Sequence, residues 1–237
     1  MTTRLRLFPL NAVLFPGAVL NLHVFEARYK QLIDECLQSG EGFGVVLIRE
    51  GQEAGDPAVE PHDVGSVAEI QEVTPLPFGR FYVTTVGRSR FHIREIVSRE
   101  PYLLVEADLI DDDDRTAAQT EDLREAVRDK FLEYLQLIVE LGGSDQSPDL
   151  PADARGASFI IADALQISDE IKQKLLELDD TGERLRVELG FLERLLPQLR
   201  AMIERRAEER ERRGGEGEHD PQRAEQEKFF GKYFSTN

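Results

Sequence analysis

The sequence predicts an α+β fold, in which a mostly β amino-terminal part with one helix precedes a carboxy-terminal helical bundle. Two observations predict this. Residues 1–110 are rich in Val, Phe, Gly and Pro, and their apolar positions often alternate, as in half-buried strands. Beyond about residue 117 the apolar positions instead recur every three or four residues, which is typical of helices that pack on one side.

The boundary between the two parts is marked by four consecutive aspartates at residues 111–114. Their charges repel one another and resist burial, so we expect a linker there. We therefore divide the chain into a β-rich domain at residues 1–112, a helical bundle at 113–205, and a charged flexible tail with an aromatic end at 206–237.

Several short strands are expected in the first part. In YLLVEADLI, residues 102–110, every second residue from Leu103 to Leu109 is apolar, so these side chains share one strand face. The other expected strands cover residues 4–8, 12–15, 18–24, 43–48, 64–73 and 80–96. Gly87 is expected to break the last of these with a turn. Short strands joined by turns are typical of a small barrel or sandwich.

One helix is expected within the β-rich part, in FEARYKQLIDECLQSG at residues 25–40. Its apolar positions follow a period near 3.6, and Gly40 is placed as a carboxy-terminal cap. The stripe consists of Phe25, Tyr29, Leu32, Ile33, Cys36 and Leu37. Because Cys36 lies on this stripe, we predict that it is a small buried hydrophobic residue.

Four helices are expected in the second part. They cover residues 117–141, 156–166 and 169–178, and a long helix begins near Thr181. Ser168 is placed as an N-cap, and Pro197 is expected to kink the long helix. The leucines of this last helix are spaced four and three residues apart. That pattern fits a coiled-coil dimer, but packing within the chain is the commoner explanation and the one we favour.

Composition excludes several classes of partner. A net charge of -17 would repel a phosphate backbone, because nucleic-acid affinity comes largely from Lys and Arg, so nucleic acid is not expected as a partner. We see no secretion signal and no run of roughly 20 apolar residues, so we expect no membrane association. Cys36 is the only cysteine, and a lone thiol fits a reducing, cytoplasmic location.

The motifs of common catalytic sites are absent. The sequence has no phosphate-binding loop, no dinucleotide fingerprint and no serine nucleophile elbow. Its four histidines are scattered, without the spacing that a metal site requires. We therefore predict a non-enzymatic protein with no cofactor and no metal.

Five stretches together resemble the N-terminal substrate-binding domain of Lon proteases. They are PLNAVLFPG (9–17), LHVFEARY (22–29), LPFGRFYV (76–83), the Gly-x-x-Arg-Phe at 87–91 and the KQKLLE helix (172–177). The resemblance covers about residues 4–203 and implies a PUA-like pseudo-barrel followed by a helical bundle. Lon proteases continue into ATPase and protease modules, whereas this chain ends after the helices, so it resembles the stand-alone members of the family.

The motif residues are expected to serve mainly as scaffold. They are Pro16, Gly17, Phe25, Glu26, Arg28, Gly87, Arg90 and Phe91. Phe15 precedes a proline and must be extended, so Pro16 and Gly17 are predicted to form a turn before the next strand. Glu26 needs a partner if it is partly buried, and Arg90 is our candidate for that ion pair.

The segment TPLPFGRFY, residues 74–82, departs from the family pattern. The family usually has Asp before Gly-Arg, where this chain has Phe78. Apolar side chains at a loop tip are costly to expose, so the tip either contacts a peptide or packs beneath the helical part. We name Leu76, Phe78, Arg80 and Tyr82 as candidate peptide-binding residues.

The leading hypothesis for function is a module that binds unfolded or apolar polypeptide segments, on apolar barrel positions and in the groove between barrel and bundle. The alternative is an adaptor or assembly protein that docks on a protease or chaperone through its tail. The candidate contacts are Phe229, Phe230, Tyr233 and Phe234, which could instead cover an apolar patch of their own chain. A small-ligand pocket or an unrecognised hydrolase is a third hypothesis.

Overall fold

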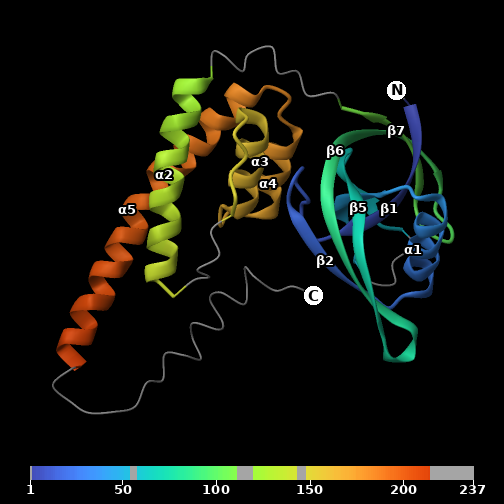
Figure 1. Cartoon of the computed structure of the whole chain (residues 1–237), viewed down its shortest axis with the longest axis horizontal. Coiled ribbons are helices and arrows are strands. Elements are labelled where there is room, and N and C mark those ends of the chain that lie inside the picture. Colours follow the sequence, from blue (N-terminus) through green and yellow to red (C-terminus); the bar gives the residue numbers. More distant parts are fainter. Residues whose placement is uncertain (1, 54–57, 111–119, 143–147, 214–237) are drawn as a thin grey trace.

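The computed structural model describes residues 2–53, 58–110, 120–142 and 148–213. The strands all come from the amino-terminal half of the chain and form one body, and the last four helices lie beside that body (Figure 1). This arrangement confirms the α+β class. The expected domain boundary near residue 112 lies outside the described residues.

The strands form a seven-stranded sheet that closes on itself. Their bounds are β1 (Thr2–Leu10), β2 (Val19–Val24), β3 (Phe43–Glu50), β4 (Glu60–Pro61), β5 (Val64–Leu76), β6 (Arg80–Ser98) and β7 (Leu104–Leu109). The order is β1-β7-β6-β5-β3-β4, and β2 pairs with β6. Because β1 also pairs with β3, in parallel, five strands complete a ring, and β1, β3, β6 and β7 all contribute to one apolar cluster, which includes Leu7, Phe91 and Val105.

Two details of the strand prediction are wrong. Residues 12–15 form no strand, and β6 runs through Gly87 without a turn. Gly87 is needed for a close approach instead: its N–H donates to Ala18 O and its carbonyl accepts from Gly17 N, both at 2.9 Å. A Cβ on Gly87 would lie 2.1 Å from the carbonyl oxygen of Phe15, so only glycine fits.

The predicted turn at Pro16 and Gly17 is confirmed. Ala18 N donates to Phe15 O at 3.1 Å, and Gly17 has a φ of 84°, which glycine adopts without a steric penalty. Phe15, just before the turn, is fully buried. The turn therefore reverses the chain at the barrel surface and leads it into β2.

The single helix of the β-rich part is α1 (Ala27–Ser39), and its cap is as predicted: Gly40 has a φ of 71° and its N–H donates to Cys36 O. Cys36 is buried, which raises the pKa of its thiol to about 11. Two members of the predicted stripe are not buried. Phe25 precedes the helix and Leu37 lies at its edge, and both side chains are half exposed.

The helices of the second part are α2 (Glu121–Glu140), α3 (Ala154–Ala164), α4 (Asp169–Glu177) and α5 (Thr181–Arg213). Their apolar stripes meet in a second core between α2, α3 and α5, where Phe131, Ile161 and Leu192 are buried. The leucine seam of α5 therefore packs within the chain, as favoured, and α5 continues past Pro197.

Helices α3 and α4 share an apolar cluster with residues of the β-rich part. Phe159, Leu175 and Leu176 belong to the same apolar cluster as the barrel residues Phe15 and Phe43. Since these side chains are almost fully buried, separating the helices from the strands would expose a large apolar area. Barrel and helices are thus packed together, and the surfaces at and beside their junction are the places to look for a site.

Candidate functional site

The hairpin between β5 and β6 ends in an exposed apolar tip, the turn η1 (Pro77–Gly79). The Phe78 side chain is 90% exposed, and the hairpin ends on the side away from α2–α5 (Figure 1). Of the two arrangements considered for this tip, the structure adopts the exposed one. The tip does not pack beneath the helices.

The backbone of the tip is unusual for the residues that form it. Phe78 has a φ of 65° and Gly79 a φ of 62°. Two consecutive left-handed residues make a hairpin turn that suits the strand twist, and Asn-Gly is the usual pair there. A phenylalanine in this conformation lowers the stability of the fold by about 1–2 kcal/mol, and exposing its ring to water lowers it further. The tip therefore carries a side chain that the fold does not require.

The three other candidate residues lie on one face of this hairpin. Leu76 pairs with Arg80 across the two strands, and Tyr82 is two residues further along β6. Since successive side chains alternate between faces, the two β6 residues point the same way, and so does a cross-strand partner. The Arg80 guanidinium also lies 5.8 Å from the centre of the Phe78 ring. The structure thus brings the predicted residues together.

His23 of the neighbouring strand β2, and Phe25 just after that strand, add rings that the sequence analysis did not assign to the binding surface. His23 pairs with Tyr82, and their rings are 5.2 Å apart. Phe25, next to this pair, has its ring centre 5.7 Å from that of His23. Tyr82 and Phe25 are each half exposed, so the three rings form one accessible cluster.

The same face continues toward the start of β2. Thr84 donates to the Asn21 side chain at 3.0 Å, and beyond them Val19 lies opposite Val86. Val19 is well exposed. We call this surface the hairpin face; it consists of Val19, Asn21, His23, Phe25, Leu76, Phe78, Arg80, Tyr82, Thr84 and Val86. Its β2 members were detectable only as the outward positions of an expected strand.

A small pocket lies at the edge of the hairpin face. It has a volume of about 50 Å³ and lies between β1 and β2, where Leu10, Leu22 and Val24 contribute apolar walls. Tyr29 also lines it, and burial raises the pKa of this phenol to about 12, so its hydroxyl stays protonated at neutral pH. The pocket is large enough for a methyl or methylene group, and Glu26 and Glu53 line it beside the apolar side chains.

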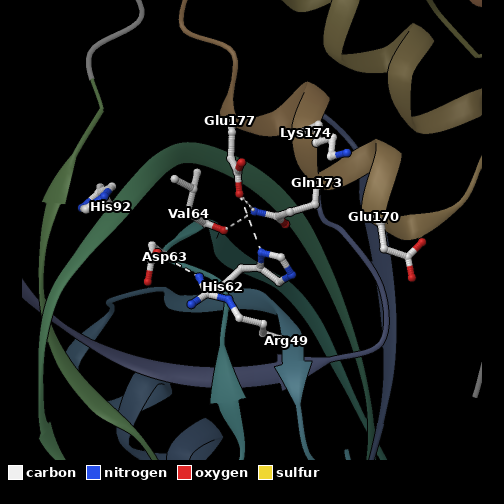
Figure 2. A pocket seen from close by; sticks show the side chains of 9 residues that line it. All are labelled: Arg49, His62, Asp63, Val64, His92, Glu170, Gln173, Lys174 and Glu177. Atoms are coloured by element: carbon white, nitrogen blue, oxygen red, sulfur yellow. Dashed lines mark hydrogen bonds and ion pairs between the residues drawn. The ribbon is translucent and has the colours of Figure 1, made fainter.

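The groove expected between barrel and helices is present, but it is charged. A cleft of about 460 Å³ lies beside α4, and Figure 2 shows the side chains that line it. Arg49 pairs with Asp63 at 2.8 Å, while Glu177 accepts from Gln173 at 2.8 Å and lies 3.8 Å from His62. These contacts satisfy charges where the barrel meets α4. Among the residues that line the cleft, Val64 alone has an apolar side chain.

No metal site is found in the described ranges: nowhere in them do three or more His, Cys, Asp or Glu side chains gather as ligands would. Nor does any described helix combine the length and apolar composition that crossing a bilayer requires. The aromatic residues 229–234 of the tail lie outside the described part of the chain.

The predicted ion pair between Glu26 and Arg90 is replaced by other contacts. Glu26 accepts from Arg28 at 3.0 Å. Arg90 is completely buried and donates to the carbonyl oxygens of Leu176 and Leu178 at the end of α4, and to Asp179. The last carbonyls of a helix lack partners within it, so a buried guanidinium satisfies them.

A second arginine, from α5, also contacts the end of α4. Arg184 of α5 is also buried, donates to Leu178 O at 2.7 Å and lies 3.9 Å from the centre of the Phe159 ring. Arg90 lies 5.7 Å from the same ring. Phe91, next to Arg90, is buried against Gly44 and Gly65. Arg90 and Phe91 therefore both make buried contacts within the folded chain.

Comparison with known proteins identifies relatives of this chain. Residues 4–194 match the ATP-dependent protease La (LON) substrate-binding domain. A Lon protease of Roseiflexus castenholzii is 30% identical over 198 residues, which cover 80% of this chain and 24% of that protein. Lon protease 2 of Myxococcus xanthus is 28% identical over 194 residues, 78% of this chain and 22% of that protein. The chain thus spans about a quarter of the length of the curated relatives it matches.

Solved structures are similar over the same region. A Lon N-terminal domain protein from Xanthomonas campestris superposes with a TM-score of 0.60 at 27% identity, covering 79% of this chain and 98% of that one. The N-terminal domain of a Mycobacterium avium complex Lon protease gives a TM-score of 0.56 at 16% identity, covering 81% and 98%. The second likeness shows the fold alone.

Proposed function

The chain belongs to the family of LON substrate-binding domains, and from that membership we propose that it binds unfolded or apolar polypeptide segments on the hairpin face. The family match confirms the resemblance expected from the motifs. A substrate-recognition module needs accessible apolar groups that are held in place before the ligand arrives. The hairpin face offers such groups on paired strands.

The observation that carries the proposal is the tip residue Phe78. It is 90% exposed and left-handed, so it costs the folded chain free energy on two counts. A residue that lowers stability in this way, and whose ring has the Arg80 guanidinium 5.8 Å from its centre, is best explained by a contact made with a ligand. The ring would regain this free energy when a polypeptide covers it.

Binding on such a surface is expected to be weak and broad in specificity. Each apolar side chain that is buried contributes roughly 1.5–3 kcal/mol. Ordering the polypeptide and losing its free motion offset much of that gain. A few contacts therefore suffice for reversible capture of an unfolded segment, but a folded protein with its apolar groups inside would not be held.

We propose no catalytic role. The family match concerns a substrate-binding domain, and in the α4 cleft Arg49 pairs with Asp63 while Glu177 accepts from Gln173. The protein then presents segments to other machinery without changing them. Its partners would be polypeptides that expose apolar side chains.

The test is Phe78→Asn. Asparagine tolerates the left-handed conformation, so the free energy of unfolding of this variant is expected to rise by about 1 kcal/mol. The variant is also expected to lose most of its affinity for denatured proteins. The matched control is Val97→Asn, which removes another exposed apolar side chain, at the end of β6 far from the tip. The immobilised variants are exposed to native and denatured forms of one protein, and capture is measured.

The outcomes separate a binding role from a structural one. Greater stability with weaker capture supports the proposal. If Phe78→Asn captures denatured protein as well as wild type does, or if Val97→Asn loses capture equally, the hairpin face is not the binding surface.

A further inference from the structure

Apolar groups recur along the hairpin face, from the tip into β6. Phe78, Tyr82 and Val86 follow one another at intervals of four residues, and the last two point to the same face. Tyr82 and Val86 both lie in β6, so at about 3.3 Å per residue they are about 13 Å apart, whereas Phe78 precedes the strand in the turn at the tip. The face therefore has three apolar anchors in a row: the tip, the aromatic cluster of Tyr82 with His23 and Phe25, and the pair of Val86 with Val19.

The positions between the anchors carry opposite charges. Arg80 lies between the first and second anchors, and the Lys30 ammonium is 3.8 Å from where a side chain on Gly79 would begin. Between the second and third anchors lies Thr84, whose partner on β5 is the exposed Glu72. One interval is thus positive and the other negative.

An extended polypeptide matches both features. Its side chains at the first, fifth and ninth positions point the same way and are also about 13 Å apart, whereas a helix advances only about 6 Å over four residues. Opposite charges at the third and seventh positions would then face Arg80 and Glu72. Resting on the proposed function, we infer that the hairpin face selects extended segments with a large apolar side chain at every fourth position and one charge of each sign between them.

The inference specifies a charge order as well as a spacing. The structure leaves the chain direction of the bound segment open, so either acid-then-base or base-then-acid is preferred when the peptide is read from its amino terminus. Exchanging the two protein charges, Arg80→Glu with Glu72→Arg, must reverse whichever order the wild type prefers. Both side chains lie on the surface, so the exchange is not expected to disturb the core.

The experiment uses labelled eleven-residue peptides and fluorescence anisotropy with the full chain. One series places three leucines at intervals of three, four or five residues with a neutral background. A second series keeps the four-residue interval and varies the two charges. We expect the four-residue peptide to bind about tenfold more tightly than the others, because a wrong interval leaves at least one anchor uncovered. We expect the charge-exchange variant to reverse the preferred order.

Each result bears on a separate statement. Equal affinity at all three intervals overturns the spacing, and an unchanged preference in the charge-exchange variant overturns the charge order; in both cases binding itself still supports the proposed function. Tighter binding by the three-residue series points to a helical ligand and overturns the extended one. If no peptide binds wild type more tightly than Phe78→Asn, the proposed function itself fails.

Discussion

Replacing Arg90 by methionine tests the contact that joins the barrel to the helices. The wild-type guanidinium is fully buried and donates to Leu176 O at 2.5 Å and to Leu178 O at 3.1 Å. Methionine fills a similar length but donates nothing, so two carbonyls lose a hydrogen bond at a buried junction. Each such loss costs about 1–3 kcal/mol, and relief from burying a charge offsets part of the sum. We expect the free energy of unfolding to fall by about 2–4 kcal/mol.

The measurement is urea unfolding followed by circular dichroism, with the slope against urea checked for constancy. For a domain of this size the loss corresponds to a fall in melting temperature on the order of 10 °C. Arg88→Met is the matched control: Arg88 is two residues away on the same strand, but its two hydrogen bonds to Glu69 are exposed to solvent. Exposed ion pairs contribute little, so the control is expected to unfold like wild type.

Two results would refute this reasoning. If Arg90→Met loses less than about 1 kcal/mol, the carbonyls at the end of α4 find other partners and the guanidinium does not hold the junction. If the free energy of unfolding falls equally in both variants, the loss of a positive charge explains the effect, and the loss of the buried hydrogen bonds does not. Should Arg90→Met fail to fold, Arg90→Lys, which reaches fewer acceptors, is expected to give an intermediate loss.

Two further predictions concern single residues of the scaffold. Gly87→Ala places a Cβ 2.1 Å from Phe15 O and is expected to lower the free energy of unfolding in urea by at least about 2 kcal/mol. Gly190→Ala, with open space around it in α5, is the control and should be neutral or stabilising by up to about 1 kcal/mol. Equal effects of the two substitutions would mean that the close approach at Gly87 is unimportant. Burial raises the pKa of Cys36 to about 11 from a model-compound value of 9.0, so at pH 8 about a hundredfold less thiolate forms, and a thiol reagent should label the native chain far more slowly than the urea-unfolded chain. Similar labelling rates in both states would contradict the burial.

Local pattern determined much of this protein. The 3.6-residue period placed α1 and the helices of the second part within a few residues, because an amphipathic helix leaves its signature in its own sequence. The glycine after α1 and the Pro-Gly turn were predictable for the same reason, since each depends on the conformation of one or two residues. The short motifs also pointed to the family and, through Phe78, to the hairpin tip.

The tertiary structure alone decided what depends on residues that are distant in the chain. Gly87 was expected to make a turn, but it is a glycine because the backbone at Phe15 and Gly17 crosses against it. Arg90 was expected to pair with Glu26, but the carbonyl groups that it satisfies lie at the end of α4. Every residue type has a backbone carbonyl, so no sequence pattern indicates which carbonyl oxygens will need a hydrogen-bond donor from a distant side chain.

The hairpin face shows the same division. The sequence by itself identified Phe78 and the alternation that puts Arg80 and Tyr82 on one side of a strand. Only the pairing of β2 with β6 brought His23 and Phe25 beside Tyr82, across almost sixty residues of chain. Strand register is set by the burial of every inward side chain at once, so it becomes known only when the whole core is assembled.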